Sequence, residues 1–113
     1  MEDAAEQDGA ALLAEGLRLT RVGDGFAAHE LFEDLWRKAA PAERDFFQGL
    51  VHVAVAPYQE ARGHRIGMRS QLAKARRRLA PYAPTHRGVD VAAVLLWCEA
   101  ALDRDSCGEP PPV

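Results

Sequence analysis

Residues 26–39 read FAAHELFEDLWRKA, and the spacing of their apolar members predicts a helix that faces a core. The apolar positions recur at i, i+3, i+4, i+7, i+8 and i+11, which places them on one stripe of an α-helix. They are Ala28, Leu31, Phe32, Leu35, Trp36 and Ala39. Because other helices must cover such a stripe, this segment indicates a helical domain.

The same periodicity recurs on both sides of this segment. Before it we expect a helix from about Ala11 to Arg21, which ends at the tight connection Gly23-Asp24-Gly25. After it we expect helices over about 43–61, 65–80 and 89–102. The connections are short, which favours antiparallel neighbours. The sequence therefore predicts an all-α fold, a single-domain antiparallel bundle of about five helices.

The expected helix over 43–61 is apolar nearly all round, which is typical of a central helix. Pro57 interrupts it, since proline lacks the backbone donor and its ring clashes with the carbonyl of Val53. We therefore expect a kink at Pro57 or an early end of the helix.

The length and the charge of the chain limit its possible domain organisation and its possible partners. The 113 residues suffice for one domain, which we place at residues 9–103, between a disordered acidic N-terminus (1–8) and a flexible proline-rich tail (104–113). With 14 basic and 17 acidic residues, the formal charge of −3 argues against a nucleic-acid partner. The acidic start lacks the pattern of a signal peptide, and no apolar run approaches the ~18–20 residues that span a bilayer. We expect a cytoplasmic protein without a membrane segment.

The two cysteines differ in their surroundings. Cys98 lies among apolar residues and resembles a small buried hydrophobe, whereas Cys107 lies in the polar tail. A disulfide between them is disfavoured because nothing else indicates an oxidising compartment. The two tryptophans, Trp36 and Trp97, are expected to be core anchors.

Four polar residues on two of the expected helices form a candidate cluster. His29 and Glu33 are one turn apart on the helix over 26–39, and Gln48 and His52 are one turn apart inside the apolar helix over 43–61. A buried amide and imidazole need partners, and we expect His29 and Glu33 to supply them. The candidate pocket contains six residues: His29, Glu30, Glu33, Trp36, Gln48 and His52.

This cluster has a structural and a functional interpretation. In the structural one, the network only fixes the register of the two helices. In the functional one, a carboxylate-paired histidine acts as a general base, or His29, Glu33 and His52 bind a metal. The residues leave both interpretations open, and they do not identify a cofactor.

A second feature is basic. No acid occurs from Ala61 to Val89, while arginines are frequent. The simpler interpretation is a solvated face that balances the acidic N-terminal third. The sharper one is an anion-binding site formed by Arg62, Arg65, Arg69 and Arg76.

Two motifs carry a resemblance to a known family. The run GFAAHELFEDLW (25–36) and the run ERDFFQGLVH (43–52) resemble the signature of the bacterial and archaeal family called domain of unknown function 309. The resemblance covers roughly residues 17–80 and implies a compact helical protein of prokaryotes with no assigned activity. His29, Glu30, Glu33, Trp36, Gln48 and Gly49 fall on the motif. Ala27 departs from the glutamate common there, and Pro57 interrupts a helix that usually continues.

Two hypotheses of different classes follow, and the residues do not decide whether the protein is an enzyme. The first is a binding protein for a small anionic ligand that uses the polar cluster, with a metal-dependent hydrolase-like activity as its variant. The second is a helical module for interaction with a protein or for assembly into a homo-oligomer, in which the cluster is only structural.

Overall fold

The computed structural model describes residues 2–113, and the side chains from residue 9 onward. Five α-helices account for most of this part of the chain: α1 (Glu2–Arg21), α2 (Gly25–Lys38), α3 (Pro41–Ala61), α4 (Arg65–Leu79) and α5 (Val91–Arg104). The predicted all-α bundle of about five helices is confirmed. No described helix has the length and apolar character needed to cross a membrane.

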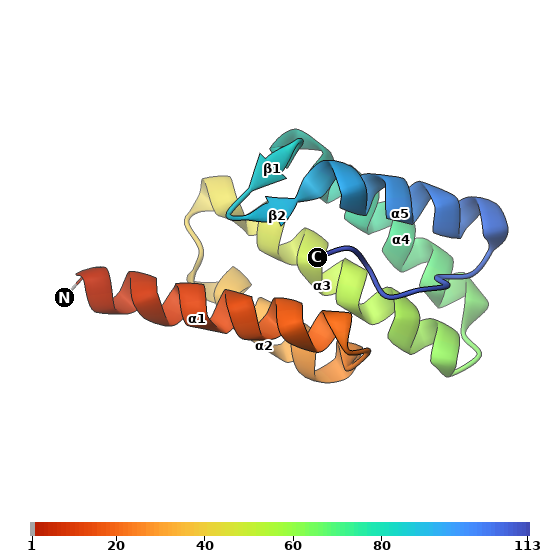
Figure 1. Cartoon of the computed structure of the whole chain (residues 1–113), viewed down its shortest axis with the longest axis horizontal. Helices are drawn as coiled ribbons and strands as arrows, with labels where there is room; N and C mark the ends of the chain where they lie inside the picture. Colours follow the sequence, from red (N-terminus) through yellow and green to blue (C-terminus); the bar gives the residue numbers. More distant parts are fainter. Residues whose placement is uncertain (1) are drawn as a thin grey trace.

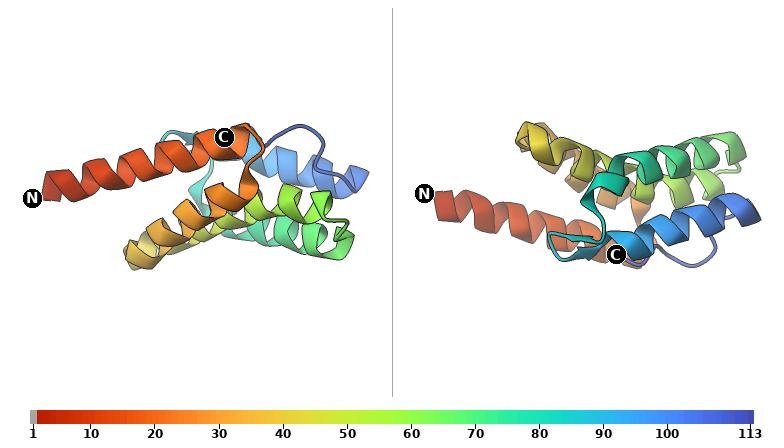
Figure 2. Two further views of the ribbon diagram at one scale, coloured as in Figure 1. Left: turned by 90° about the horizontal axis from the view of Figure 1, so that it is seen from below. Right: turned by 90° about the horizontal axis from the view of Figure 1, so that it is seen from above.

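The helices form two layers. Helices α2, α3 and α4 lie side by side in chain order, and α1 and α5 lie in the second layer (Figure 2). The C-terminal segment runs between α1 and α5 (Figure 1). Helix α3 is therefore central, in contact with α2 on one side and α4 on the other.

The packing of α3 follows from its sequence. As expected for a central helix, eight of its residues are buried: Phe46, Phe47, Gly49, Leu50, His52, Val53, Ala54 and Ala56. Its contact with α2 is close at Gly25, where an added Cβ would collide with the carbonyl oxygen of Ala54. Of the two outcomes expected at Pro57, the early end is wrong, because α3 continues to Ala61, and the kink stays a prediction. Packing on two sides stabilises the helix more than the one missing hydrogen bond destabilises it.

Asp24 and Asp90 determine where α2 and α5 begin. The Asp24 side chain accepts a hydrogen bond from the backbone N–H of Ala27 at 3.2 Å, and Asp90 accepts one from Ala93 at 3.0 Å. These are N-caps, which satisfy backbone donors that a helix leaves free at its start. Helix α5 thus begins at Val91, two residues after the predicted start.

A small hairpin precedes α5 and was not predicted. After the 3-10 turn η1 (Ala80–Tyr82), strands β1 (Thr85–His86) and β2 (Val89–Asp90) pair antiparallel. Both turn residues between them have positive φ, 48° at Arg87 and 78° at Gly88. This backbone suits a two-residue hairpin. Two-residue strands are too short to show an alternating pattern, so the sequence contained no periodic signal for them.

The two ends of the chain were expected to be disordered or flexible. The tail that we expected to be flexible packs against the helices, with Cys107 1% exposed and Pro111 buried. The backbone of residues 2–8 is part of α1, which begins earlier than the expected helix start at about Ala11, and the expected disorder of residues 1–8 stays a prediction.

Candidate functional site

His52 is the most buried of the predicted site residues, and it faces α4. Its side chain is 8% exposed, and its Nδ1 lies 2.7 Å from Oε1 of Gln71 on α4. An α-helix turns by about 100° per residue, so His52 lies about 40° beyond Gln48 around α3. That rotation directs it toward α4 and away from α2. The expectation that His29 and Glu33 supply its partners is therefore wrong.

The surroundings of His52 favour a neutral imidazole. Burial lowers its pKa below the ordinary value of 6.5, the hydrogen bond to Gln71 counteracts this in part, and the charges of Arg78, Lys74 and Arg77 lower it further. Because the Gln71 oxygen accepts, the proton resides on Nδ1. The Nε2 atom is buried without a hydrogen-bond partner among the described residues. This pair joins α3 to α4 and fixes their register.

His29 and Glu33 lie on the solvent side of α2. Nδ1 of His29 bonds to the carbonyl oxygen of Phe26 in the preceding turn, and the two rings meet edge to face at 4.9 Å. The Phe26 ring is also 5.7 Å from the ring of Tyr58 on α3. Glu33 forms a weak ion pair with Arg37, with 3.6 Å between Oε2 and Nη2. These contacts are local to the surface between α2 and α3.

Trp36 is a surface residue, so the prediction that it anchors the core is wrong. Its side chain is 36% exposed, and Phe26 on the same helix is 51% exposed. Trp97 is partly buried, and its Nε1 donates to the carbonyl oxygen of Glu109 at 3.0 Å. Neither tryptophan lies in the fully buried core.

The surface that α2, α3 and α4 turn away from α1 and α5 is called here the outer face. Positions at i, i+3, i+7 and i+10 share one side of a helix, which assigns its members on α2 and α3. The members are Phe26, His29, Glu33 and Trp36 on α2, Gln48, Val51, Val55 and Tyr58 on α3, and Gln71 and Lys74 on α4. All of them are at least partly exposed. The structure thus brings His29, Glu33, Trp36 and Gln48 to one surface, with Glu30 exposed beside them, while His52 is buried beneath it.

The candidate metal ligands are not assembled. His29 and Glu33 lie on the outer side of α2, whereas His52 is turned toward α4. Among residues 9–113, no three His, Cys, Asp or Glu side chains gather closely enough to hold a metal ion.

The four arginines expected to form an anion site do not act together. Arg69 Nη1 lies 3.1 Å from Oδ1 of Asp105, and Arg65 Nε bonds to Oδ2 of the same carboxylate. The hydrogen bond from Arg65 is the largest of the effects that lower the pKa of Asp105. Arg62 instead stacks on Tyr58, 5.5 Å from the ring centroid.

Arg76 occupies a different surface from the other three. It lines an open groove of about 430 Å³ between α4 and α5, together with Arg77 and opposite Glu99. The four arginines therefore have three different surroundings. Arg65 and Arg69 belong to an ion-paired cluster, Arg62 lies on an aromatic ring, and Arg76 lines this groove.

No pattern in the sequence predicted the polar cluster between the start of α3 and the hairpin. The carboxylate of Glu43 lies 2.9 Å from Nε2 of His86 and also bonds to Nε of Arg87. Burial raises the pKa of Glu43, but the hydrogen bonds from Arg87 and His86 together lower it further, so the net shift is downward. Only the Arg87-Gly88 turn could have indicated that His86 folds back toward α3. The cluster fastens the hairpin to α3.

Comparison with protein families gives a match that covers the site. A family model described as Domain of unknown function (DUF309) matches residues 13–71, more than half of the chain. The matched region includes all of α2 and α3 and about half of α4, which are the helices of the outer face. No curated protein matches the chain.

Proposed function

The chain belongs to the family described as Domain of unknown function (DUF309), and we propose that it is a self-association module whose outer face binds the outer face of a second copy. The proposal goes beyond the family, whose description assigns no activity. It selects the interaction hypothesis over the ligand-binding one, because the predicted cluster is a surface rather than a pocket.

The observation that carries the proposal is the exposure of two large aromatic side chains on one side of α2. Phe26 and Trp36 are 51% and 36% exposed, and the partly exposed Val51 and Val55 of α3 continue the apolar surface. Burial of apolar surface contributes about 25 cal/mol per Å². Tryptophan is also enriched among the residues that dominate binding energy at protein interfaces. Burial of this surface against a second molecule would therefore stabilise the complex.

The charges at the two edges of the outer face favour a second copy as the occupant. Glu30 lies along α2, beside the Glu33–Arg37 pair, while Lys74 lies along α4, on the other side of α3. In a two-fold dimer with its axis parallel to α3, α2 of one copy faces α4 of its partner. Glu30 of each copy then lies on the side of its partner's Lys74, and this pairing of opposite charges favours the orientation and speeds association.

The size of the outer face fits a reversible dimer. Helix α3 has 21 residues, α2 has 14 and α4 has 15. At about 1.5 Å per residue and about 9 Å between helices, the three cover roughly 650 Å². Stable interfaces bury about 600–1,000 Å² per partner. The face is therefore at the lower end of that range, so the dimer should dissociate on dilution.

Sedimentation equilibrium of the full chain tests the proposal. The wild type should show a monomer–dimer equilibrium, and Trp36→Ser should weaken it about tenfold or more, the effect typical of an interface anchor. Leu96→Ser is the matched control, because Leu96 is 66% exposed on α5, away from the outer face. A wild type that stays monomeric at millimolar concentration, or an equal effect of Leu96→Ser, would contradict the proposal.

A charge swap tests the orientation of the two copies. Glu30→Lys and Lys74→Glu should each weaken the dimer, since each places like charges across the interface. The double variant should recover most of the affinity. If the two single effects simply add in the double variant, the α2-to-α4 arrangement is wrong.

A further inference from the structure

Three helices hold the C-terminal segment, residues 105–113, in a groove on the opposite side of α3 from the outer face. Trp97 on α5 donates from Nε1 to the carbonyl oxygen of Glu109 at 3.0 Å. Arg21 on α1 donates from Nη1 to the backbone oxygen of Val113 at 2.7 Å. Glu60 on α3 accepts from the backbone N–H of Cys107 at 3.2 Å. The segment thus lies as a bound ligand would, across α1, α3 and α5.

The contacts match the chemistry of a proline-rich segment. Residues 110–112 are prolines, which have no N–H to donate. A binding site can therefore form hydrogen bonds with the backbone of these residues only through donors that reach carbonyl oxygens. The indole of Trp97 and the guanidinium of Arg21 are such donors, and they reach the backbone oxygens of Glu109 and Val113, the residues on either side of the three prolines. A proline-rich segment is already extended when free, and it loses little conformational entropy on binding. Pro111 is buried in the groove.

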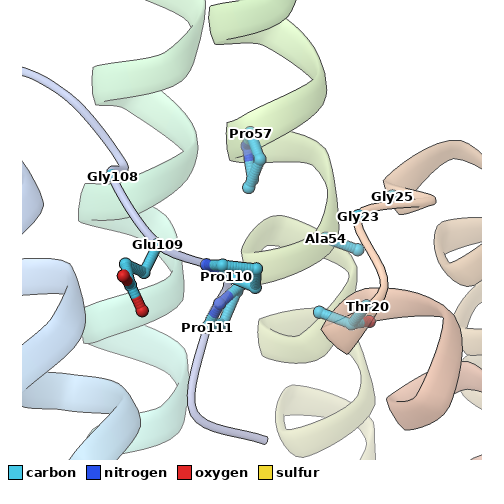
Figure 3. A pocket seen from close by; sticks show the side chains of 9 residues that line it. All are labelled: Thr20, Gly23, Gly25, Ala54, Pro57, Gly108, Glu109, Pro110 and Pro111. Carbon is cyan, nitrogen blue, oxygen red and sulfur yellow. The ribbon is translucent and has the colours of Figure 1, made fainter.

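The tail leaves part of this groove empty. A cavity of about 160 Å³ remains between the tail and the connection from α1 to α2. Figure 3 shows Pro110 and Pro111 on one side of it and Ala54 and Thr20 on the other. Its walls are residues 108–111 of the tail together with Thr20, Gly23, Gly25, Ala54 and Pro57.

The walls of the cavity are mainly apolar. Ala54 and Pro57 present only hydrocarbon, and the hydroxyl of Thr20 is already bonded to the carbonyl oxygen of Gly16 at 2.8 Å. An apolar cavity of about 150 Å³ is large enough to hold a benzene molecule. The cavity is therefore large enough for one aliphatic side chain that this tail does not supply.

We propose that the groove between α1, α3 and α5 is a recognition site for an extended proline-rich segment of another protein that carries one aliphatic side chain. The chain's own tail is the intramolecular competitor of that segment. It makes the carbonyl contacts but leaves the cavity unfilled. The site is separate from the outer face, and the proposal does not rest on self-association.

Competition with the tail determines how the site must be tested. A tethered segment has an effective concentration in the millimolar range, so an external peptide binds weakly while the tail is in place. Pro110→Ser/Pro111→Ser weakens the tail without changing α1, α3 or α5. Pro112→Ser is the matched control, because Pro112 is exposed.

The experiment titrates synthetic peptides into the ¹⁵N-labelled full chain and follows the Trp97 indole N–H signal. The peptide Gly-Glu-Leu-Pro-Pro-Val should bind the Pro110→Ser/Pro111→Ser chain about tenfold more tightly than the Pro112→Ser chain. It should also bind about tenfold more tightly than Gly-Glu-Pro-Pro-Pro-Val, since leucine fills the cavity. Equal dissociation constants in either comparison would overturn the proposal.

A folding control and a second variant distinguish a change in binding from misfolding. Circular dichroism first establishes that the double-serine chain keeps its helices. Trp97→Phe is then added to it, and binding of the leucine peptide is measured by calorimetry. The loss of the indole donor should weaken binding severalfold. An unchanged affinity would show that the peptide binds elsewhere and would also overturn the proposal.

Discussion

Nδ1 of His52 lies 2.7 Å from Oε1 of Gln71, so a buried imidazole and an amide join α3 to α4. The amide oxygen keeps the imidazole proton on Nδ1, while burial keeps the ring neutral. Removal of either partner would leave a polar group without its hydrogen bond in a buried position, which costs about 1–3 kcal/mol. The pair therefore stabilises one register of the two helices.

Gln71→Glu should raise the pKa of His52. A carboxylate in place of the amide favours the charged imidazole, typically by about one pKa unit or more at this distance. NMR titration of the ring signals of His52 measures the change against the wild type, whose pKa lies below 6.5. Gln59→Glu is the control, because Gln59 bonds to His64 instead. A His52 titration that is equal in the wild type and Gln71→Glu would contradict the observed contact.

His52 should make the fold less stable as the pH falls from 7 to 5. Its pKa is lower in the folded than in the unfolded chain, so the unfolded chain binds a proton first and unfolding becomes easier. One proton contributes at most about 1.4 kcal/mol per pH unit. Urea unfolding at pH 7.0 and 5.5 should show a smaller pH dependence in His52→Gln than in the wild type. The same dependence in both would exclude His52 as its source.

Glu43 should contribute stability at higher pH that is lost in acid. Its pKa is lowered in the folded chain, so its contribution is present above about pH 4.5 and disappears as the pH falls through the folded pKa. We expect Glu43→Gln to destabilise the fold at pH 7 by only about 1 kcal/mol, because the partners His86 and Arg87 are partly exposed and water weakens the interaction. At pH 3 the effect should be much smaller. Asp45→Asn, which removes a more exposed ion pair with Arg78, should have the smaller effect at pH 7.

The helices could be predicted because their signal is local. The apolar stripe of α2 predicted the burial of Ala28, Phe32 and Leu35, all of which are buried. Trp36 belongs to the same pattern but lies at the edge of the stripe next to α3. A pattern of spacing identifies the side that packs, but not how far the neighbouring helices extend around it. That is why the exposed tryptophan was not predicted.

The candidate site was predictable only in part, because it depends on which neighbour lies on which side of α3. The i, i+4 spacing of Gln48 and His52 correctly places them on neighbouring positions of α3. It contains no information about whether α2 or α4 covers the next 40° of the helix. The handedness of the bundle decides that, and His52 therefore bonds to Gln71.

Contacts between distant segments had no signal in the sequence. Glu43 meets His86 across 43 residues, and Trp97 meets the tail through a backbone carbonyl that any residue would provide. We expected a flexible tail because its composition is polar and rich in proline. Cys107 and Pro111 nevertheless find apolar surroundings between α1 and α5.

Gly25→Ala should destabilise the fold by about 1–3 kcal/mol. The added Cβ would collide with the carbonyl oxygen of Ala54, and a backbone atom inside α3 cannot move aside as a side chain can. Gly67→Ala is the matched control. Its Cβ would meet only the Gln59 side chain, at 3.3 Å, and helix propensity favours alanine by up to about 1 kcal/mol. Thermal and urea unfolding of both variants measure the difference, and equal stabilities would contradict the close approach of α2 to α3.

The two thiols should be slow to react, and Cys107 should react before Cys98. Burial raises the pKa of each to about 12, so at pH 8 the thiolate is roughly a thousandfold scarcer than in a free cysteine. Cys107 becomes accessible when the tail detaches, whereas Cys98 is fully buried on α5 and requires wider unfolding. Reaction with a disulfide reagent, followed residue by residue with mass spectrometry, gives the two rates. Trp97→Phe should accelerate the reaction of Cys107 and leave that of Cys98 nearly unchanged, because it removes a contact that holds only the tail. If both thiols accelerate together, the tail does not detach as a separate unit.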